Sequence, residues 1–479
     1  MPVRPITVPT ALLLSIRVFC VNTDFSSLAL PVEQLNNLAD LGYTTMTPIQ
    51  AKALPLILQG QDVLAKAKTG SGKTAAFGIG LLSRLEVSRY QTQALVLCPT
   101  RELADQVGKE LRRLARATPN IKILTLCGGV PMGPQLDSLT HPPHIVVGTP
   151  GRIQDHLHRR SLTLDHLQAL VLDEADRMLD MGFADVMVDV IRQAPKRRQT
   201  LLFSATYPDE IARISAQVQK DPVEVSVEAT HDSRHIDQSF FEVERGARAS
   251  ALLKILAHFQ PDSCVVFCNT KRECQSVHDT LRARDISVLA LHGDLEQRER
   301  DQVLVRFSNR SCRVLVATDV AARGLDIKDL AAVINYEMAQ DPEIHIHRIG
   351  RTGRAGQSGL ALSLCTPQEM QRALALEDYL GGRLSWFNLS ALKTTTQVPL
   401  QPEMVTLCID GGKKAKIRPG DILGALTGDA GLAGSEVGKI DLFDTHAYVA
   451  IRQASANKAL KCLQQGKLKG KNCKARLVI

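Results

Sequence analysis

Residues suited to phosphate chemistry begin with Ala67–Thr74, AKTGSGKT, which follows an apolar run and precedes a helical pattern. Glycines in such a loop let backbone N–H groups surround phosphate oxygens, and the start of the helix adds a favourable field. Lys73 would reach the β- and γ-phosphates of a nucleotide, and the Thr74 hydroxyl would bind Mg²⁺. The other loop residues expected to contact ATP are Lys68, Thr69, Gly70, Ser71 and Gly72.

A second group of chemical residues is acidic and ends another apolar run, at Asp173-Glu174-Ala175-Asp176. Beside a phosphate loop, one carboxylate would hold Mg²⁺, partly through water, and a second would orient or deprotonate the attacking water. We assign Asp173 to the metal and Glu174 to the water. Taken alone, these residues could also form a solvated acidic turn, the less favoured interpretation.

The third group has three arginines within seven residues, in His347–Arg354, HRIGRTGR. Arg suits planar, multidentate phosphate recognition, and a hydrolase with no Arg in its phosphate-loop domain needs one from elsewhere. Arg351 and Arg354 are therefore the predicted arginine fingers, although a basic surface would have the same composition. Hydrolysis would then require two domains to close, which couples the ATP state to whatever lies across them.

The elements that position these groups form an alternating pattern over residues 48–385. Short apolar, β-branched runs alternate with longer helical patterns, which indicates parallel sheets covered by helices on both faces. Nearly every run ends in a polar or glycine-rich cluster, and ligands of such sheets bind at the carboxyl ends of the strands. A break near residues 208–236 divides this body into two α/β domains of similar size.

The chain as a whole is predicted to have three folded parts. The last of them reads strand–helix–strand–strand–helix–strand, a split βαβ fold with one antiparallel sheet backed by two helices. The expected parts are a poorly ordered or mis-assigned extension at 1–22, a first domain at 23–225, a linker at 226–236, a second domain at 237–385, a linker at 386–402 and a small α+β domain at 403–479.

Composition and charge limit the possible functions. Apolar residues make up 44% and charged residues 23% of the chain, as in folded globular proteins, and no apolar run reaches the roughly 20 residues of a membrane span. The 11 cysteines include no CxxC pair, so we expect neither a disulfide framework nor a metal cluster. This use of cysteine also predicts a cytoplasmic protein. The last 79 residues hold 13 basic and 7 acidic side chains, or +6 of the net charge of +8. A basic tail on a nearly neutral body favours an anionic partner such as nucleic acid.

Taken together, the ordered motifs resemble those of the DEAD-box RNA helicases over roughly residues 25–385. The resemblance implies two tandem RecA-like domains, an ATP-dependent and RNA-stimulated ATPase, and local unwinding of short duplexes. It rests on GYTTMTPIQ (42–50), AKTGSGKT, PTRELA (99–104), GG (128–129), TPGR (149–152), DEAD, SAT (204–206), VVFCNT (265–270), ATDVAARGLD (317–326) and HRIGRTGR.

The resemblance also implies how adenosine is bound. Gln50 would read the adenine edge, with Tyr43 stacking on the ring and Phe25 lying upstream at the family's spacing. ATP would then be selected over GTP because the wrong base leaves hydrogen-bonding groups unpaired. Asp326 would reach the ribose. Met46 stands where the family commonly has Pro, a departure that leaves Gln50 in place.

RNA contacts and coupling residues are implied in the same way. Ser204, Thr206 and His347 would link the ATP site to strand separation. The residues expected to hold RNA phosphates and sugars are Thr100, Arg101, Gly129, Thr149 and Arg152 in the first domain and Thr270, Arg300 and Thr318 in the second. Contacts of this kind are blind to base sequence, so the core is not expected to choose its RNA.

The tail resembles the RNA-recognition motif that follows the core in the bacterial DbpA subfamily, most clearly in KKAKIRPGDILGAL (413–426). That subfamily acts on large-subunit ribosomal RNA, which implies a 23S hairpin and pre-50S particles as partners. Base stacking on the sheet is weakened, because DTHAYVAI (444–451) offers only His446 and Tyr448. We therefore expect basic loops and the sheet edge to grip RNA, through Lys413, Lys414, Lys416, Arg418, Lys467, Lys469, Lys471, Lys474 and Arg476.

The sequence thus predicts a monomeric RNA helicase that hydrolyses ATP with Mg²⁺ and remodels 23S ribosomal RNA during large-subunit assembly. An alternative is an RNA-binding assembly scaffold whose ATPase times release rather than unwinding. A DNA helicase is disfavoured, because the adenine motif around Gln50 and an RNA-recognition tail accompany the acidic motif.

Overall fold

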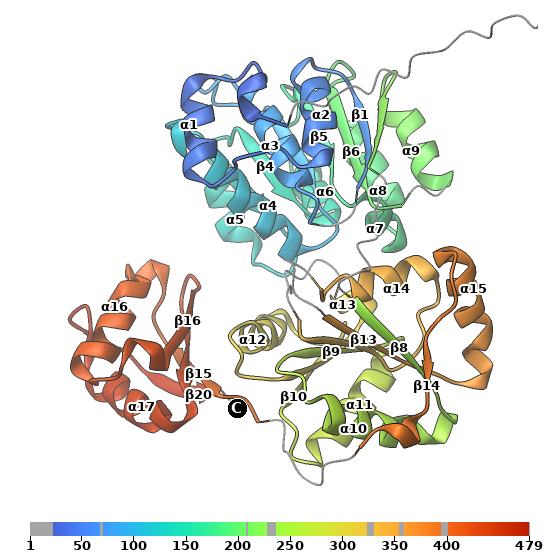
Figure 1. Cartoon of the computed structure of the whole chain (residues 1–479). Coiled ribbons are helices and arrows are strands. Elements are labelled where there is room, and N and C mark those ends of the chain that lie inside the picture. The colour runs from blue at the N-terminus through green and yellow to red at the C-terminus, as the bar shows by residue number, and fades with distance from the viewer. Residues whose placement is uncertain are drawn as a thin grey trace, which may run out of the picture. The chain divides into compact units, whose positions relative to one another are not determined.

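The structure is a computed structural model that describes residues 23–67, 70–206, 209–227, 236–322, 330–353, 359–393 and 401–478 (Figure 1). It divides into two compact units, Met1–Ala229 and Thr230–Ile479. The first unit contains one α/β domain, and the second contains another α/β domain and the small tail domain. The expected extension at residues 1–22 lies outside the described residues.

The described part of the first unit is built on a seven-stranded parallel sheet with the order β3-β4-β2-β5-β6-β1-β7. Its strands are β1 (Val63–Lys66), β2 (Ala94–Leu97), β3 (Ile123–Leu126), β4 (Ile145–Gly148), β5 (Ala169–Leu172), β6 (Gln199–Ser204) and β7 (Val223–Ser226). Its helices are α1 (Val32–Asp40), α2 (Pro48–Leu58), α3 (Lys73–Arg84), α4 (Arg101–Leu114), α5 (Met132–Leu139), α6 (Pro150–His158), α7 (Ala175–Asp180), α8 (Ala184–Arg192) and α9 (Asp209–Val218).

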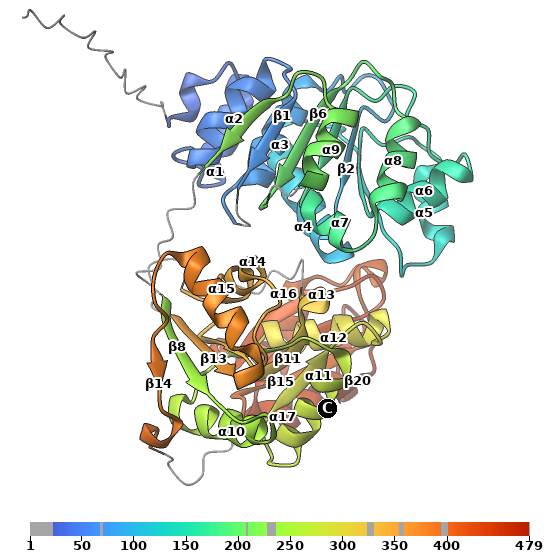
Figure 2. The same cartoon turned by 90° about the vertical axis from the view of Figure 1, so that its right-hand side faces the viewer.

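Helices cover both faces of this sheet, as Figures 1 and 2 show. One core packs α2, α3 and α4 against one face, with Ile57, Phe77 and Leu111 at its centre. The other core packs α6, α8 and α9 against the opposite face. The central strands are buried along their whole length, which explains why they read as continuous apolar runs rather than as an alternation.

The second unit repeats the architecture with a seven-stranded parallel sheet in the order β10-β11-β9-β12-β13-β8-β14 among its described residues. Its strands are β8 (Ile236–Glu242), β9 (Cys264–Cys268), β10 (Val288–Leu291), β11 (Val314–Thr318), β12 (Ala332–Asn335), β13 (Gly359–Cys365) and β14 (Trp386–Phe387). Its helices are α10 (Arg248–Phe259), α11 (Lys271–Arg282), α12 (Gln297–Ser308), α13 (Asp319–Ala322), α14 (Pro342–Ile349) and α15 (Met370–Leu380). Helices α10 and α11 contribute to one core, and α12 and α13 to another.

The tail has a four-stranded antiparallel sheet with the order β16-β17-β15-β20. Its elements are β15 (Met404–Ile409), α16 (Pro419–Gly424), β16 (Val437–Leu442), β17 (Ala447–Arg452), α17 (Ala456–Gln465) and β20 (Ala475–Val478), with a small hairpin of β18 (Lys467–Leu468) and β19 (Lys471–Asn472) before the last strand. The two tandem parallel-sheet domains and the small βαββαβ domain confirm the predicted fold class.

Several strands were not expected from the sequence. β7 and β8 add to the sheets near the break in the apolar pattern, and β14 lies inside the segment expected to be a linker. β7 and β14 are edge strands with mostly exposed side chains, so they lack the buried apolar run by which the other strands are recognised. Because Trp386 pairs with Phe240, the second sheet includes residues that were expected to belong to the linker at 386–402.

Candidate ATP and RNA sites

The phosphate loop joins β1 to α3. Gly72 is the N-cap residue of α3 at a φ of 95°, and a Cβ atom there would lie 2.6 Å from Nε2 of Gln50. Glycine is therefore required both by the left-handed backbone and by the close approach of Gln50. Lys73 is buried, and its Nζ donates to the backbone oxygen of Ala67 at 3.0 Å. Lys68 and Thr69 lie outside the described residues.

Gln50 connects the start of α2 to the phosphate loop. Its Oε1 accepts from the backbone N–H of Thr47 at 2.9 Å, and its Nε2 donates to the backbone oxygen of Gly72 at 3.1 Å. Phe25 is buried and packs edge-on against Tyr43, with ring centroids 6.1 Å apart. Gln50 thus lies against the loop, and Phe25 and Tyr43 pack in one cluster with Ala75 and Ala76 near the start of α3.

Asp173 follows β5 and is only 2% exposed. Burial raises the pKa of its carboxyl group to about 6, while the positive charge of Lys73 opposes the rise. Its Oδ1 has no hydrogen-bond partner among the described residues. A buried, unpaired carboxylate oxygen and the hydroxyl of Thr74 are oxygen ligands of the kind that Mg²⁺ prefers, so these residues fit the ion.

Glu174 is held by an arginine that the sequence analysis did not single out. Its Oε2 lies 2.7 Å from Nη1 of Arg177, and the two side chains are 4% and 6% exposed. Glu174 itself adopts a left-handed backbone with a φ of 54°. In the sequence Arg177 is only a charged residue three positions after Glu174 on a short helix, so its burial could not be read from the pattern.

Asp176 was also given no role, although it connects two motifs. Its Oδ2 accepts from the backbone N–H groups of Ala205 and Thr206 and from the Thr206 hydroxyl, at 3.0–3.1 Å. The Ser204 hydroxyl donates to the backbone oxygen of Thr206 at 2.6 Å. The end of β6 is thus tied to the acidic group after β5. In the sequence, Asp176 was visible only as the fourth residue of the acidic motif, and its partners could be identified only from the fold.

The carboxyl edge of the first sheet is divided between two sets of residues. The phosphate loop, the acidic group and Ser204–Thr206 follow β1, β5 and β6, which are neighbours in the sheet. The predicted RNA residues follow the other three neighbours, β3, β4 and β2. Thr100 caps α4 through the N–H of Leu103, Thr149 accepts from the N–H of Gly128, and Arg152 donates to the oxygen of Val130. Arg101 begins α4, and Gly129 has a φ of 71°.

In the second unit, predicted residues again follow neighbouring strands. Thr270 comes after β9 and caps α11, and Thr318 ends β11. Arg300 lies on α12, where it donates to the oxygen of Ala321 at 2.7 Å. His347 lies near the end of α14, and Arg351 follows that helix. Asp326 and Arg354 lie outside the described residues.

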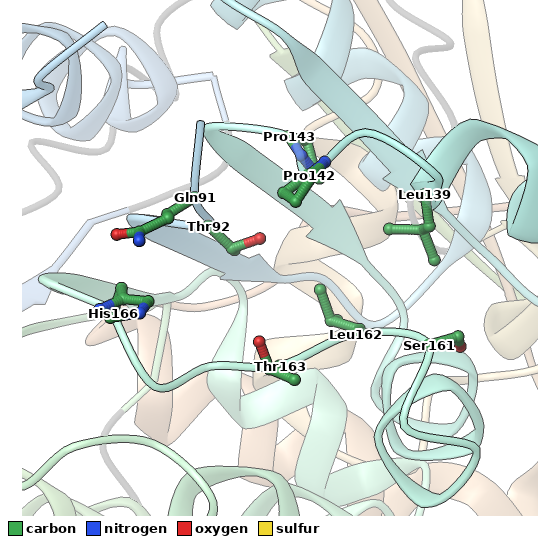
Figure 3. A pocket seen from close by; sticks show the side chains of 9 residues that line it. All are labelled: Gln91, Thr92, Leu139, Pro142, Pro143, Ser161, Leu162, Thr163 and His166. Carbon is green, nitrogen blue, oxygen red and sulfur yellow. The ribbon is translucent and has the colours of Figure 1, made fainter. Parts of the chain in front are cut away.

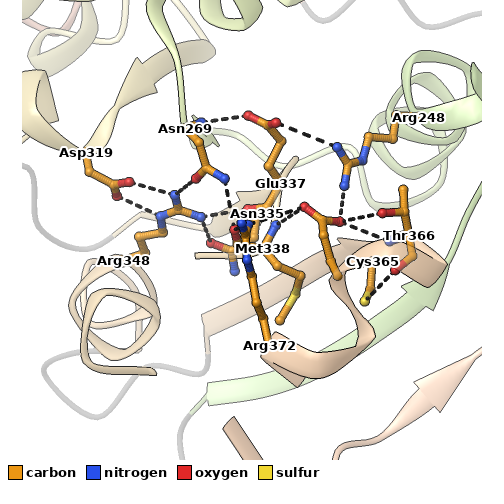
Figure 4. A network of polar contacts seen from close by, with 11 residues as sticks. Arg248, Asn269, Asp319, Asn335, Glu337, Met338, Arg348, Cys365, Thr366 and Arg372 are labelled. Atoms are coloured by element: carbon orange, nitrogen blue, oxygen red, sulfur yellow. Dashed lines mark hydrogen bonds and ion pairs between the residues drawn. The ribbon is translucent and has the colours of Figure 1, made fainter. Parts of the chain in front are cut away.

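The first arginine of HRIGRTGR differs from its neighbours in the motif. Arg348 is buried and forms a two-pronged contact with Asp319, with both nitrogen–oxygen distances at 2.7 Å (Figure 4). It also donates to Asn269, Asn335 and the backbone oxygen of Glu337. Arg348 therefore joins the segments after β9, β11 and β12 within the domain.

The open face of the tail sheet is packed against the second α/β domain. Cys408 of β15 and Tyr448 of β17 form an apolar cluster with Val305 of α12. The Thr406 hydroxyl bonds to Asn309 and Ser311 at 2.9 Å. Because Tyr448 is buried there, the aromatic residue considered for base stacking has a packing role in this structure.

Most basic residues of the tail lie on the loop 413–418 and on the segment after α17, whereas Arg476 of β20 is opposite Cys408 of β15 and so lies on the packed face of the sheet. Lys413, Lys414, Lys416 and Arg418 are exposed, as are Lys469, Lys474 and Arg476. The two groups are connected, because Nζ of Lys469 donates to the oxygen of Lys416 at 2.7 Å and lies 3.4 Å from Asp421. Lys467 and Lys471 lie on the hairpin β18–β19. The loop 413–418 and Lys469, in the turn of this hairpin, thus form one basic surface, which we call the loop–hairpin surface.

A separate cavity of about 220 Å³ lies at the other end of the first sheet (Figure 3). It is lined by Gln91, Thr92, Leu139, Pro142, Pro143, Ser161, Leu162, Thr163 and His166. Thr92, Pro143 and His166 precede β2, β4 and β5, so the cavity is at the amino ends of these strands. None of the predicted site residues lines it.

Comparisons with known proteins agree with this geometry. Three family profiles match: DEAD/DEAH box helicase at residues 47–214, helicase conserved C-terminal domain at 247–356 and DbpA RNA binding domain at 406–477. The ATP-dependent RNA helicase DbpA of Escherichia coli (strain K12) is 61% identical over 457 residues, which cover 95% of this chain and 100% of that protein. The DEAD-box ATP-dependent RNA helicase CshA of Geobacillus kaustophilus (strain HTA426) is 44% identical over 73% of this chain and 74% of that protein.

A solved structure is similar as well. Saccharomyces cerevisiae Dbp5 bound to RNA and ADP BeF3 has a TM-score of 0.70 and 30% sequence identity, covering 77% of this chain and 96% of that chain. Among the helices that the structure describes, none has the length and apolar character that crossing a membrane demands.

Proposed function

Because the chain belongs to the DEAD-box ATP-dependent RNA helicases, and within them to the DbpA type, we propose that it uses ATP to remodel large-subunit ribosomal RNA. Its target would be a hairpin of 23S RNA in pre-50S particles, bound by a monomer in the cytoplasm. The observation that carries the proposal is the loop–hairpin surface, which remains exposed while the sheet face of the same domain is packed. The match to a DbpA RNA binding domain over residues 406–477 supports it.

For ATP, we propose that Gln50 and Tyr43 hold the adenine and Lys73 the β- and γ-phosphates. A bound Mg²⁺ would neutralise phosphate charge. Asp173 and Thr74 are the residues that would hold it. Glu174 then orients and deprotonates the attacking water. Nζ of Lys73 donates one hydrogen bond to the oxygen of Ala67 and has two further N–H groups with which it would bind phosphate oxygens.

For the coupling of ATP to RNA, Asp176 and Thr206 are the proposed connection. A phosphate or metal that moves the acidic group moves the end of β6 with it, because three hydrogen bonds join them. Arg351 and Arg354 supply positive charge to the transferring phosphate, and His347 shares the coupling role.

For RNA, the core residues bind the sugar-phosphate backbone and the loop–hairpin surface selects the target. Core contacts of Thr100, Arg152 and Thr270 read no bases. Lysines and arginines on two connected loops instead present a patch whose shape a folded hairpin can match, since structured RNA is recognised largely by shape and phosphate position.

The experiment is crosslinking of the full chain to total cellular RNA, with a variant in which Lys413, Lys414 and Lys416 are changed to Glu. We expect one reproducible peak on a 23S hairpin that the variant loses. The salt dependence of binding should also fall by about one in slope for each phosphate contact removed. Unchanged affinity and specificity in the variant would reject the loop–hairpin surface as the targeting site.

A further inference from the structure

A buried polar network lies at the carboxyl end of the second sheet, beside a residue proposed to bind RNA (Figure 4). Two of its members, Arg248 and Glu337, belong to none of the motifs described above. Arg248 opens α10 and is 8% exposed, and Glu337 follows β12. A charged side chain this deeply buried is rarely found without a specific partner.

Glu337 holds the loop that follows β9. Its Oε2 accepts from the backbone N–H of Asn269 at 2.7 Å. The Asn269 side chain is fixed as well, because its Nδ2 donates to the oxygen of Met338 at 3.0 Å and its Oδ1 accepts from Arg348 at 2.7 Å. Thr270 is the next residue and begins the cap of α11. Glu337 therefore fixes the backbone of Asn269, and through it the position of Thr270.

Arg248 in turn holds Glu337. One guanidinium nitrogen lies 3.7 Å from Oε1 of Glu337, and another is paired with Glu369. Glu369 accepts from the backbone N–H groups of Met338 and Thr366, at 3.3 Å and 3.0 Å. The arginine thus bridges two carboxylates that belong to the segments after β12 and β13.

We propose that Arg248 and Glu337 are positioning residues for RNA binding, which fix the Asn269–Thr270 loop so that Thr270 meets an RNA phosphate. The inference rests on the proposed function, in which Thr270 contacts RNA. Although Nε of Arg248 has no hydrogen-bond partner among the described residues, its guanidinium group lies between two carboxylates. Such a buried network favours one geometry, because a rearrangement would leave a buried charge without its ion partner. Neither residue is among those proposed to hold the adenine, ribose or phosphates of ATP. Their loss should therefore raise the RNA concentration needed for half-maximal ATP hydrolysis and leave the affinity for nucleotide unchanged.

The test is Glu337→Gln in the full chain, with ATP hydrolysis measured against the concentration of purified 23S ribosomal RNA. We expect the half-saturating RNA concentration to rise roughly five- to tenfold, which corresponds to about 1–1.4 kcal/mol and lies within the range of one ordinary hydrogen bond. The rate at saturating RNA and the affinity for a fluorescent ADP should stay within about twofold of the unmodified protein. Glu337→Asp keeps the charge near Arg248 but withdraws the carboxylate from Asn269, and we expect it to act in the same direction.

Two controls separate positioning from folding. Arg313 is ion-paired with Asp262 at 3.1 Å, at the amino end of the same sheet. Arg313→Met removes an arginine from the domain without touching the network, so its half-saturating RNA concentration should not change. Arg248→Lys should recover part of what Arg248→Met loses, because it restores a positive charge between the two carboxylates. Thermal unfolding of each variant identifies any that fail to fold.

The outcomes distinguish this inference from the proposed function. If Thr270→Ala raises the half-saturating RNA concentration while both Glu337 variants leave it unchanged, the positioning role is overturned. If Thr270→Ala itself has no effect, the RNA contact in the proposed function fails, and the positioning role that depends on it fails with it.

Discussion

Packing of the tail sheet on α12 should depend on one hydroxyl group. Thr406 lies among the buried side chains of Asn309 and Ser311, with hydrogen bonds of 2.9 Å to each. Thr406→Val keeps the shape and removes the hydroxyl, so both partners lose a bond in a place that water does not reach. Leaving buried polar groups unsatisfied costs about 1–3 kcal/mol each. Asn309 and Ser311 can partly compensate each other's lost bond. We therefore expect the free energy of separating the tail sheet from α12 to fall by about 2–3 kcal/mol, which makes the equilibrium constant for this opening roughly 30- to 150-fold larger.

The assay uses Cys408, which lies under Val305 and is 1% exposed. Alkylation of a buried thiol proceeds through transient opening, so its rate follows the opening equilibrium. Peptide-resolved mass spectrometry after iodoacetamide treatment should show Cys408 modified roughly 30- to 150-fold faster in Thr406→Val. Cys264, buried in the sheet of the same unit, is the internal reference and should not change.

Thr406→Ser is the matched control, because it retains the hydroxyl and should behave much like the unmodified protein. Equal alkylation of Cys408 in Thr406→Val and in the unmodified protein, relative to Cys264, would refute the reasoning. The sheet face would then not depend on these hydrogen bonds for its cover.

Two further predictions concern buried charge. Arg177→Met leaves Glu174 as a buried carboxylate without its ion partner, so the free energy of unfolding of the first domain in urea should fall by about 3 kcal/mol. Adding Glu174→Gln should restore more than half of that loss, and strictly additive effects would contradict the pairing. For the second domain, burial lowers the pKa of His345 to about 3, so below the ordinary value of 6.5 the unfolded chain binds a proton that the folded chain excludes. Stability should therefore fall by up to about 1.4 kcal/mol per pH unit between pH 6 and pH 4, and urea midpoints at pH 7.5 and pH 5 should differ less in His345→Gln, whereas an equal difference would contradict it.

The chemistry at the ends of the strands could be predicted because phosphate and metal ligands need particular residue types. The phosphate loop and the acidic motif were found in this way at the ends of apolar runs, and the arginine motif was found from its three closely spaced arginines. The central strands could also be predicted, because strands that are buried on both faces have continuously apolar sequences. Edge strands such as β14 could not be predicted, because Trp386 and Phe387 are exposed and pair with β8, which is distant in the sequence.

Residues that act through partners far along the chain could not be predicted in the same manner. Asp176 and Thr206 are 30 positions apart, and only the order of β5 and β6 brings them together. Likewise Arg248 meets Glu369 across 121 positions. The packing of the tail sheet against α12 is a further case. In the sequence, Thr406 and Cys408 look like ordinary strand residues, and only the structure shows that α12 lies against them.

The left-handed backbone of Glu174 carries a consequence for how this protein evolves. A residue with a Cβ atom gives up about 1–2 kcal/mol in that conformation, a loss that glycine avoids and asparagine reduces. The ion pair with Arg177 opposes this loss, because a change of Glu174 to glycine would leave the arginine buried without its ion partner. The strain of the left-handed backbone can therefore be relieved at a net gain in stability only when Glu174 and Arg177 change together. Screens that reward thermal resistance should recover paired changes at these two positions rather than a single change at Glu174.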